Sequence, residues 1–237
     1  MSMKVLFLTN EYPPHIYGGA GVHVDYLSRE LAKLMQVEVR CFGDQESLGT
    51  NPAVRGFELS TDDYSCPKPL RPVFGAVQRC LDFNTENITA DLVHCHTWYS
   101  HFGGILAKWN YGIPLVITVH SLEPLRPWKR EQLGGGYDFT VWLEKTAMEM
   151  ADAVIAVSNG TKADVERLFQ VKPERLHVIY HCIDLDEYRP TEETDALVRY
   201  GLDPNRPYLL SVGSHSLAKG RIRLGVVLLY RVPGVAA

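Results

Sequence analysis

Short apolar runs alternate with segments of helical periodicity along most of this chain, and this alternation restricts the fold more than any other feature. Residues 4–9 and 113–119 are continuous apolar runs of strand length. After the first run, Val24, Leu27 and Leu31 recur at helical spacing. Strands that alternate with helices form βαβ units, so we predict an α/β fold built on a doubly wound parallel sheet.

The same patterns place the individual elements. We predict strands over residues 4–9, 37–42, 91–95, 113–119, 153–157, 176–180 and 208–212. We predict helices over residues 22–35, 73–87, 101–111, 137–151 and 161–169, the last with Ser158 as its N-cap. Residues 43–72 are expected to be mostly loop with one short strand, and residues 121–136 to be loop.

Charge and cysteine content exclude several classes of protein. The chain has 24 Lys and Arg against 28 Asp and Glu, a net charge of −4, whereas general nucleic-acid binders carry a basic surplus. Its 5 cysteines are an odd number without a Cys-x-x-Cys pair, which is not typical of a disulfide scaffold. No apolar stretch reaches the roughly 18–20 residues of a membrane span. We therefore expect a cytoplasmic protein with no nucleic-acid or membrane partner.

A glycine-rich segment follows the first predicted strand. Ligands of parallel sheets bind beyond the carboxyl ends of the strands, so the residues there are the candidate site. Gly18-Gly19-Ala20-Gly21 leads into a helix, and bare amides at a helix N-terminus bind anions. The spacing is not Gly-x-Gly-x-x-Gly, so it does not support a dinucleotide fingerprint. A tight turn required for packing would explain the same residues.

Histidines follow two further strands. His120 ends the run 113–119, where an imidazole can donate a hydrogen bond to a sugar hydroxyl, transfer a proton or cap its own loop. His94 and His96 face the same side of a strand, so a metal pair completed by His101 or His120 is one hypothesis. A strand end that feeds a cleft is the plainer interpretation.

Aromatic and glycine residues accompany these histidines. Trp98 and Tyr99 come directly after the His94–His96 strand end, where they could stack on a sugar ring. The segment 121–136 ends in Gly134-Gly135-Gly136. Successive glycines predict either a mobile hinge or a loop of close approach.

Four segments carry a resemblance to a known family: KVLFLTNEYPPHIYGGAGVHVDYLSREL, DLVHCHTW, TVHSLEPLRPWKREQLGGGY and ADAVIAVSNGTKADVERLF. Over about residues 3–208 the chain resembles the N-terminal, starch-synthase-type half of bacterial glycogen synthases. These are family-4 retaining glycosyltransferases, and the subgroup includes the maltose-1-phosphate synthases. The resemblance implies a GT-B fold, in which two Rossmann-like domains face each other across a cleft and the N-terminal one holds mainly the acceptor.

The function implied by the resemblance belongs to glycogen and α-glucan biosynthesis. Glucose would pass from a nucleotide-glucose, ADP-glucose, to an α-glucan or to glucose 1-phosphate with retention, without a metal or another cofactor. His120 matches the histidine that contacts the transferring sugar. The donor or its phosphates would meet Gly18, Gly19, Gly21 and Lys219, and the acceptor side would be lined by Tyr17, His96, Thr97, Trp98 and Glu123.

The resemblance also implies a domain organisation, from which the C-terminal part departs. We expect an N-terminal domain over residues 1–183, a linker over residues 184–207, and the start of a donor domain with a divergent tail over residues 208–237. His181-Cys182 stand where the family pattern has Asn-Gly, and Ser214 stands where it has an arginine. Serine cannot replace a bidentate cation on a diphosphate, so we expect a truncated chain with little or no transfer activity of its own.

Two alternatives to that function stay open on the sequence. A non-catalytic carbohydrate-binding domain would use Trp98 and its neighbours, and its uncovered cleft would favour self-association. A sugar-nucleotide epimerase shares the expected fold but does not explain the segment HSLEPLRPW.

Overall fold

The structure of this chain is a computed structural model that describes residues 3–59, 64–201, 203, 214–217 and 221–224. The predicted strand over residues 208–212 and the predicted donor residue Lys219 lie outside these ranges. The chain divides into two compact units, Met1–His181 and Cys182–Ala237, and each is described by itself. The domain limits drawn from the resemblance stay a prediction.

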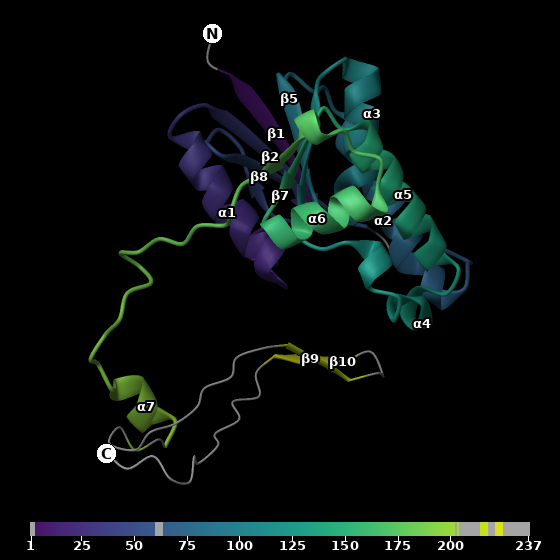
Figure 1. The fold of residues 1–237 in the computed structure, drawn as a ribbon. Coiled ribbons are helices and arrows are strands. Elements are labelled where there is room, and N and C mark those ends of the chain that lie inside the picture. Colours follow the sequence, from purple (N-terminus) through teal and green to yellow (C-terminus); the bar gives the residue numbers. More distant parts are fainter. Residues whose placement is uncertain (1–2, 60–63, 202, 204–213, 218–220, 225–237) are drawn as a thin grey trace. The chain divides into compact units, whose positions relative to one another are not determined.

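The first unit is built on a sheet flanked by helices (Figure 1). In this sheet every strand pair is parallel except β3 with β4. In the described residues this sheet has 8 strands in the order β3-β4-β2-β1-β5-β6-β7-β8. The predicted doubly wound α/β fold is confirmed. The strands are β1 (Lys4–Thr9), β2 (Gln36–Phe42), β3 (Glu46–Ser47), β4 (Ala53–Phe57), β5 (Leu92–His96), β6 (Leu115–Val119), β7 (Ala153–Ala156) and β8 (Leu176–Val178).

Helices cover both faces of the sheet because side chains alternate along the buried strands. Val5 and Phe7 of β1 pack in one apolar cluster with Val24 of α1. Leu6 and Leu8 point to the other face, into a cluster with residues of α2, α3 and α5. The helices are α1 (Gly19–Ala32), α2 (Arg71–Thr85), α3 (Trp98–Tyr111), α4 (Lys129–Leu133), α5 (Gly136–Met150) and α6 (Asn159–Leu168), with 3-10 turns η2 (Lys68–Leu70), η3 (Glu123–Leu125) and η4 (Pro173–Arg175).

The strand order reverses at β1. The chain first adds β2 on one side of β1 and later adds β5 on the other side. In open α/β sheets the ligand binds at such a reversal point, outside the carboxyl ends of the strands. This topology makes the loops after β1, β5 and β6 the candidate site.

The structure differs from the sequence prediction at several element boundaries. Helix α1 begins at Gly19 instead of residue 22, because glycines without apolar side chains give no periodic signal for the first turn. The segment 43–72 contains two strands, β3 and β4, instead of one. Ser158 is the N-cap of α6 as predicted, since its Oγ accepts the N–H of Thr161 at 3.0 Å.

The segment 121–136, expected to be loop, contains η3 and α4. Its glycine run has a packing explanation, which favours the close-approach alternative. Gly134 ends α4 with φ at +53°, a conformation that side chains disfavour. A Cβ on Gly136 would lie 2.9 Å from Cγ2 of Val73, so only glycine lets α5 begin so close to α2.

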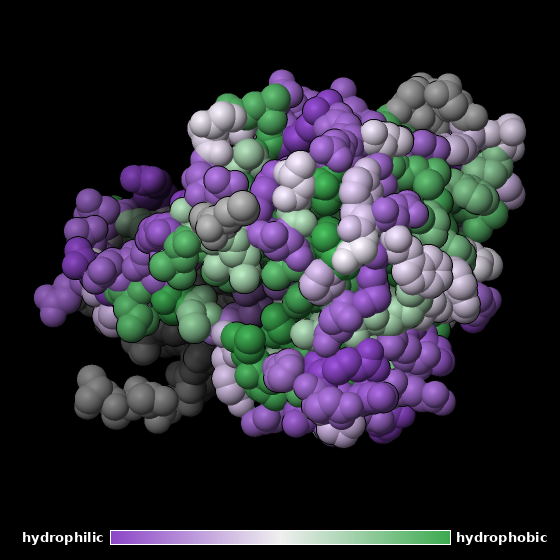
Figure 2. Space-filling view, turned by 90° about the horizontal axis from the view of Figure 1, so that it is seen from above, coloured by the Kyte–Doolittle hydropathy of each residue, from purple (hydrophilic) through white to green (hydrophobic). Residues whose placement is uncertain are grey.

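The second unit is described only in part. Helix α7 (Asp195–Arg199) lies within the predicted linker, and strands β9 (Ser214–Leu217) and β10 (Arg221–Leu224) pair antiparallel. Across the described ranges of both units, every helix is too short or too polar to cross a lipid bilayer. On the face drawn in Figure 2, hydrophilic and hydrophobic residues are intermixed, as on most folded domains.

Candidate sugar-binding site at the carboxyl edge of the sheet

A hydrogen bond joins the loops after β1 and β5. Thr97 Oγ1 donates to Asn10 Oδ1 at 2.7 Å, directly across the point where the strand order reverses. Thr97 has φ 66° and ψ 155°, a conformation that is nearly restricted to glycine and costs about 1–3 kcal/mol. Backbone strain of this kind is concentrated at functional sites, and Thr97 is one of the predicted acceptor residues.

The glycine loop after β1 is held by a carboxylate of this chain. Glu11 Oε2 accepts the backbone N–H of Tyr17 at 2.9 Å and that of Gly18 at 2.7 Å. One amide of the predicted anion site, that of Gly18, therefore already has a carboxylate partner. The Tyr17 side chain is 64% exposed on this loop, so it is accessible to a ligand.

The first turn of α1 keeps its amides available. Gly19, Ala20 and Gly21 are the first residues of the helix, whose leading N–H groups have no partner within it. A Cβ on Gly21 would lie 2.8 Å from Cβ of Glu11, whereas one on Gly19 would meet nothing within 4 Å. Gly21 is thus required for packing, and Gly19 borders open space at the positive end of the helix.

Five histidine rings, from α1, β5 and the segments after β6 and β8, form the histidine cluster. His96 Nδ1 and His120 Nε2 share a hydrogen bond at 3.0 Å. His94 Nε2 bonds to Thr118 Oγ1 at 2.8 Å. The cluster consists of His23, His94, His96, His120 and His181, with ring centroids 4.0–5.7 Å apart in the contacting pairs.

The cluster is electrically neutral at physiological pH. Burial, reinforced by neighbouring imidazoles, lowers the pKa of His120 to about 3 and that of His23 to about 4. Burial also lowers the pKa of His94 to about 3 and that of His96 well below its ordinary value. Neutral imidazoles both donate and accept hydrogen bonds, which suits polyhydroxylated ligands.

The structure does not form the metal pair considered from the sequence. In the part of the chain that the structure describes, the group of three histidines within reach of one ion includes neither His94 nor His96. Both rings of that pair are buried, and His101 lies within α3 with 1% of its surface exposed. A different set of histidine nitrogens comes within reach of one ion and is considered below.

Trp98 does not offer its ring to a ligand. The side chain is 3% exposed, belongs to the apolar core and stacks on Tyr99 with ring centroids 4.1 Å apart. The predicted stacking of Trp98 on a sugar is therefore not supported, because the first residue of α3 turns into the sheet instead of the crevice.

Glu123 is an internal ion-pair partner. It is 1% exposed, and its Oε1 accepts the Nζ of Lys129 at 2.7 Å. Its backbone N–H donates to Glu144 Oε2 at 2.7 Å, and its backbone oxygen accepts the hydroxyl of Tyr137. These bonds tie η3 to α4 and α5, so they position the segment after His120, and the predicted direct contact of the Glu123 side chain with an acceptor is not supported.

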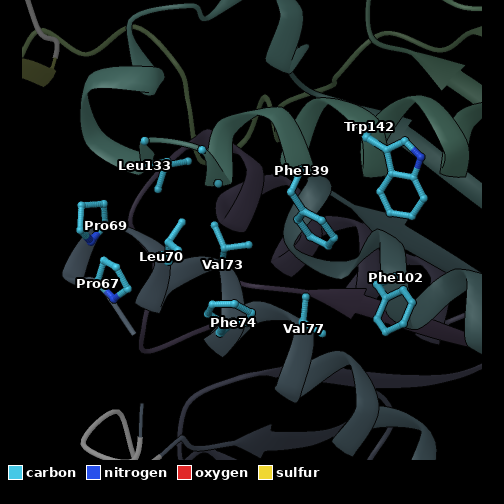
Figure 3. Close-up of a pocket in the computed structure, with 13 residues that line it drawn as sticks. Pro67, Pro69, Leu70, Val73, Phe74, Val77, Phe102, Leu133, Phe139 and Trp142 are labelled. Carbon is cyan, nitrogen blue, oxygen red and sulfur yellow. The ribbon is translucent and has the colours of Figure 1, made fainter. Parts of the chain in front are cut away.

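An apolar pocket of about 650 Å³ lies away from the histidine cluster. Val73, Phe102 and Phe139, from three different helices, line it (Figure 3). Its lining has almost no polar atoms to pair with hydroxyl or phosphate groups, so it does not suit a sugar ligand.

Sequence reasoning missed several residues of the site. Asn10, Glu11 and His23 gave no motif, although Asn10 and Glu11 directly follow a predicted strand. In the sequence, His181 stands out only as a departure from the family pattern. The bonds of Asn10 and Glu11 depend on how two loops fold back, which no local spacing encodes.

Comparison with known proteins identifies the family of this chain. A family model described as Glycosyltransferase Family 4 matches residues 17–187. An alpha-maltose-1-phosphate synthase from Mycolicibacterium smegmatis is 42% identical over 228 residues, which cover 92% of this chain and 55% of that protein. This chain thus spans little more than half the length of that relative.

Two solved structures share the fold. A sucrose-phosphate synthase from Thermosynechococcus elongatus superposes with a TM-score of 0.64 at 18% identity, covering 86% of this chain and 54% of that chain. The catalytic domain of starch synthase IV from Arabidopsis thaliana, bound to ADP and acarbose, gives a TM-score of 0.54 at 15% identity, covering 81% of this chain and 54% of that chain.

Proposed function

This chain belongs to glycosyltransferase family 4, and from that premise we propose that it supplies the acceptor-side half of a hexosyltransferase. The whole enzyme would transfer glucose from a nucleotide-glucose, ADP-glucose, to glucose 1-phosphate or an α-glucan with retention of configuration. The similarity to an alpha-maltose-1-phosphate synthase supports glucose 1-phosphate as the acceptor. The choice of ADP-glucose as donor rests on the resemblance to bacterial glycogen synthases, and the assay below compares it with UDP-glucose.

One observation carries the proposal: the His96–His120 hydrogen bond beside the joined loops after β1 and β5. In open parallel sheets this edge binds the ligand. The groups that converge there are neutral imidazoles, a threonine backbone under strain and open helix amides. Such a set matches a sugar phosphate, which presents many hydroxyls and one anion.

His120 is proposed to hold the transferring sugar by a hydrogen bond. Because Nε2 is engaged by His96, Nδ1 is the nitrogen available to a ligand. With a pKa near 3, the ring stays neutral through the physiological range and is a weak base. His120 therefore contributes a hydrogen bond that positions the sugar in the transition state, and it does not act as a general acid or base.

The first turn of α1 is proposed to face the donor. The amides of Gly19 to Gly21 and the positive helix end would stabilise negative charge on the departing diphosphate. Glu11 fixes this turn through Gly18 without occupying those amides. Lys219 stays a proposed phosphate contact, and the reaction is proposed to need no metal or other cofactor.

The alternative of a non-catalytic carbohydrate-binding domain is weaker. It depended on an aromatic platform at Trp98, and that ring is buried in the core. Self-association through the cleft stays a prediction that light scattering would test.

Sugar transfer tests the proposed function. The 237-residue chain is compared with a hybrid that joins it to the second half of the Mycolicibacterium smegmatis relative. Each receives ADP-glucose or UDP-glucose with glucose 1-phosphate or glycogen, and nucleotide diphosphate release is followed together with labelled product.

We expect the hybrid to prefer ADP-glucose and glucose 1-phosphate. His120→Ala should reduce its kcat by about 100-fold or more, as for loss of a transition-state hydrogen bond. His177→Ala, at an exposed histidine on β8, is the matched control. A His120→Ala hybrid that keeps full activity would refute the assigned site.

A further inference from the structure

Three histidines from distant parts of the first unit bring imidazole nitrogens together. His23 belongs to α1, His120 follows β6, and His181 lies beyond β8. One nitrogen from each ring can be chosen so that all three lie within 4.8 Å of one another. His23 and His181 stack with centroids 4.0 Å apart, and His120 lies 5.2 Å from each of them.

The three rings are in the form that binds metal ions. Burial lowers the pKa of His23 to about 4, that of His120 to about 3, and that of His181 below its ordinary value. At neutral pH no proton has to be displaced before an imidazole nitrogen coordinates an ion. Because neighbouring imidazoles oppose protonation of one another, the rings stay neutral and their lone pairs stay available to a dication.

A further histidine orients one of the three. His96 Nδ1 bonds to His120 Nε2 at 3.0 Å, which directs the opposite nitrogen, Nδ1, toward a ligand. Metal-binding histidines usually have such a partner on their second nitrogen, because it fixes the tautomer and the ring orientation. His96 is fully buried, so this support is rigid.

We propose that His23, His120 and His181 form a binding site for a transition-metal dication such as Zn²⁺, with one coordination position left to water. Tetrahedral zinc with Zn–N distances of about 2.0–2.1 Å places ligand nitrogens about 3.4 Å apart. The nitrogens lie within 4.8 Å of one another, and the exposed His181 has room to turn out of its stack on His23 so that the three lone pairs converge on the ion. The ion would occupy the His120 nitrogen that is proposed to hold the sugar, so Zn²⁺ and the sugar would compete for this edge and the ion takes no part in the proposed transfer.

The donor set also predicts which ions are rejected. Imidazole nitrogens favour Zn²⁺, Co²⁺, Ni²⁺ and Cu²⁺, whereas Mg²⁺ and Ca²⁺ require oxygen ligands. The three ligands of this site are all imidazoles. Zn²⁺ should therefore bind where Mg²⁺ at the same concentration does not.

Calorimetric titration of the full chain, without a polyhistidine tag and after treatment with a chelator, tests the site. We expect one Zn²⁺ per chain and no heat of binding with Mg²⁺. Co²⁺ should give the visible absorption of a tetrahedral site, and Zn²⁺ should raise the thermal unfolding temperature.

Two variants remove single ligands. His181→Asn introduces the residue of the family pattern at an exposed position, and His23→Asn removes the ligand from α1. Each should weaken Zn²⁺ binding by at least about tenfold and abolish the Co²⁺ absorption. His177→Asn should bind as the parent chain does.

The exposed thiol of Cys182, next to His181, requires its own control. Cys182→Ser should retain the stoichiometric Zn²⁺ binding. The proposal is overturned if the parent chain binds no Zn²⁺, if both histidine variants bind it as tightly as the parent, or if only Cys182→Ser abolishes binding. Circular dichroism confirms that each variant is folded.

Discussion

The carboxylate of Glu11 accepts the backbone N–H of Gly18 at 2.7 Å, which ties the loop after β1 to the N-cap of α1. This bond turns a glycine-rich segment into an ordered helix start. It leaves only the amides inside the first helical turn for a ligand. The two glycines of that turn consequently have different roles.

Gly21→Ala should destabilise the chain, whereas Gly19→Ala should not. The added methyl at residue 21 would lie 2.8 Å from Cβ of Glu11, an overpacking that costs about 1–3 kcal/mol. At residue 19 there is open space, so alanine should change the free energy of unfolding by less than about 0.5 kcal/mol or increase it. Urea denaturation measures both, and equal destabilisation of the two variants would contradict this account.

At position 97 a glycine variant should be more stable than an alanine variant, which is the reverse of the usual order of stability. The Thr97 φ of 66° with ψ of 155° is accessible to glycine and strained for any residue with a Cβ. Thr97→Gly and Thr97→Ala both lose the bond to Asn10, so their difference isolates the backbone strain. We expect the glycine variant to be more stable by about 1–2 kcal/mol in chemical denaturation. If the alanine variant is the more stable one, the residue is not strained.

Glu123 should matter for stability more than for ligand contact. Its carboxylate and the Lys129 ammonium form a buried pair, and removing one partner of such a pair costs about 3–5 kcal/mol. Glu123→Gln should therefore lower the unfolding free energy by that order, and Glu123→Gln with Lys129→Met should recover part of it. Glu193→Gln, at an exposed position, is the control. If Glu123→Gln unfolds at the same denaturant midpoint as the parent chain, the buried pair does not stabilise the fold as stated.

Glu144 should make stability fall as the pH rises. Burial raises the pKa of this carboxyl from 4.5 to about 8, so the folded chain binds its proton more tightly than the unfolded chain does. The stabilisation is complete below about pH 4.5 and is lost as the pH rises through 8. Relative to Glu144→Gln, the parent chain should lose up to about 1 kcal/mol per pH unit in that window. If the free energy of unfolding depends on pH in the same way in the parent chain and in Glu144→Gln, this role of Glu144 is excluded.

Much of the fold could be predicted because buried parallel strands leave a strong local signal. A short apolar run such as residues 4–9 predicts a buried strand, and β1 has the same bounds. The two-residue strand β3 and the five-residue helix α4 could not be predicted, because tertiary contacts define them. Helix α4 begins at Lys129, whose ammonium is bound by a carboxylate six positions earlier.

The candidate site could be predicted by location but not by contact. Parallel topology places His96 and His120 at one edge, and their hydrogen bond agrees with that expectation. The burial of Trp98 and Glu123 could not be foreseen, because a residue that follows a strand can turn toward either the crevice or the core. The folded sheet brings His23 and His181 together although they lie far apart in the sequence, so no sequence spacing relates them.

Histidine-ring NMR of the ¹⁵N-labelled chain, titrated with glucose 1-phosphate and separately with a maltooligosaccharide, tests most directly that the carboxyl edge is a sugar site. We predict saturable shifts of the ring signals of His120 and His96. The rings of His15 and His177, which lie outside the histidine cluster, should stay unchanged. Saturable binding that moves only His15 or His177, or no saturable shift with either ligand, would contradict the account.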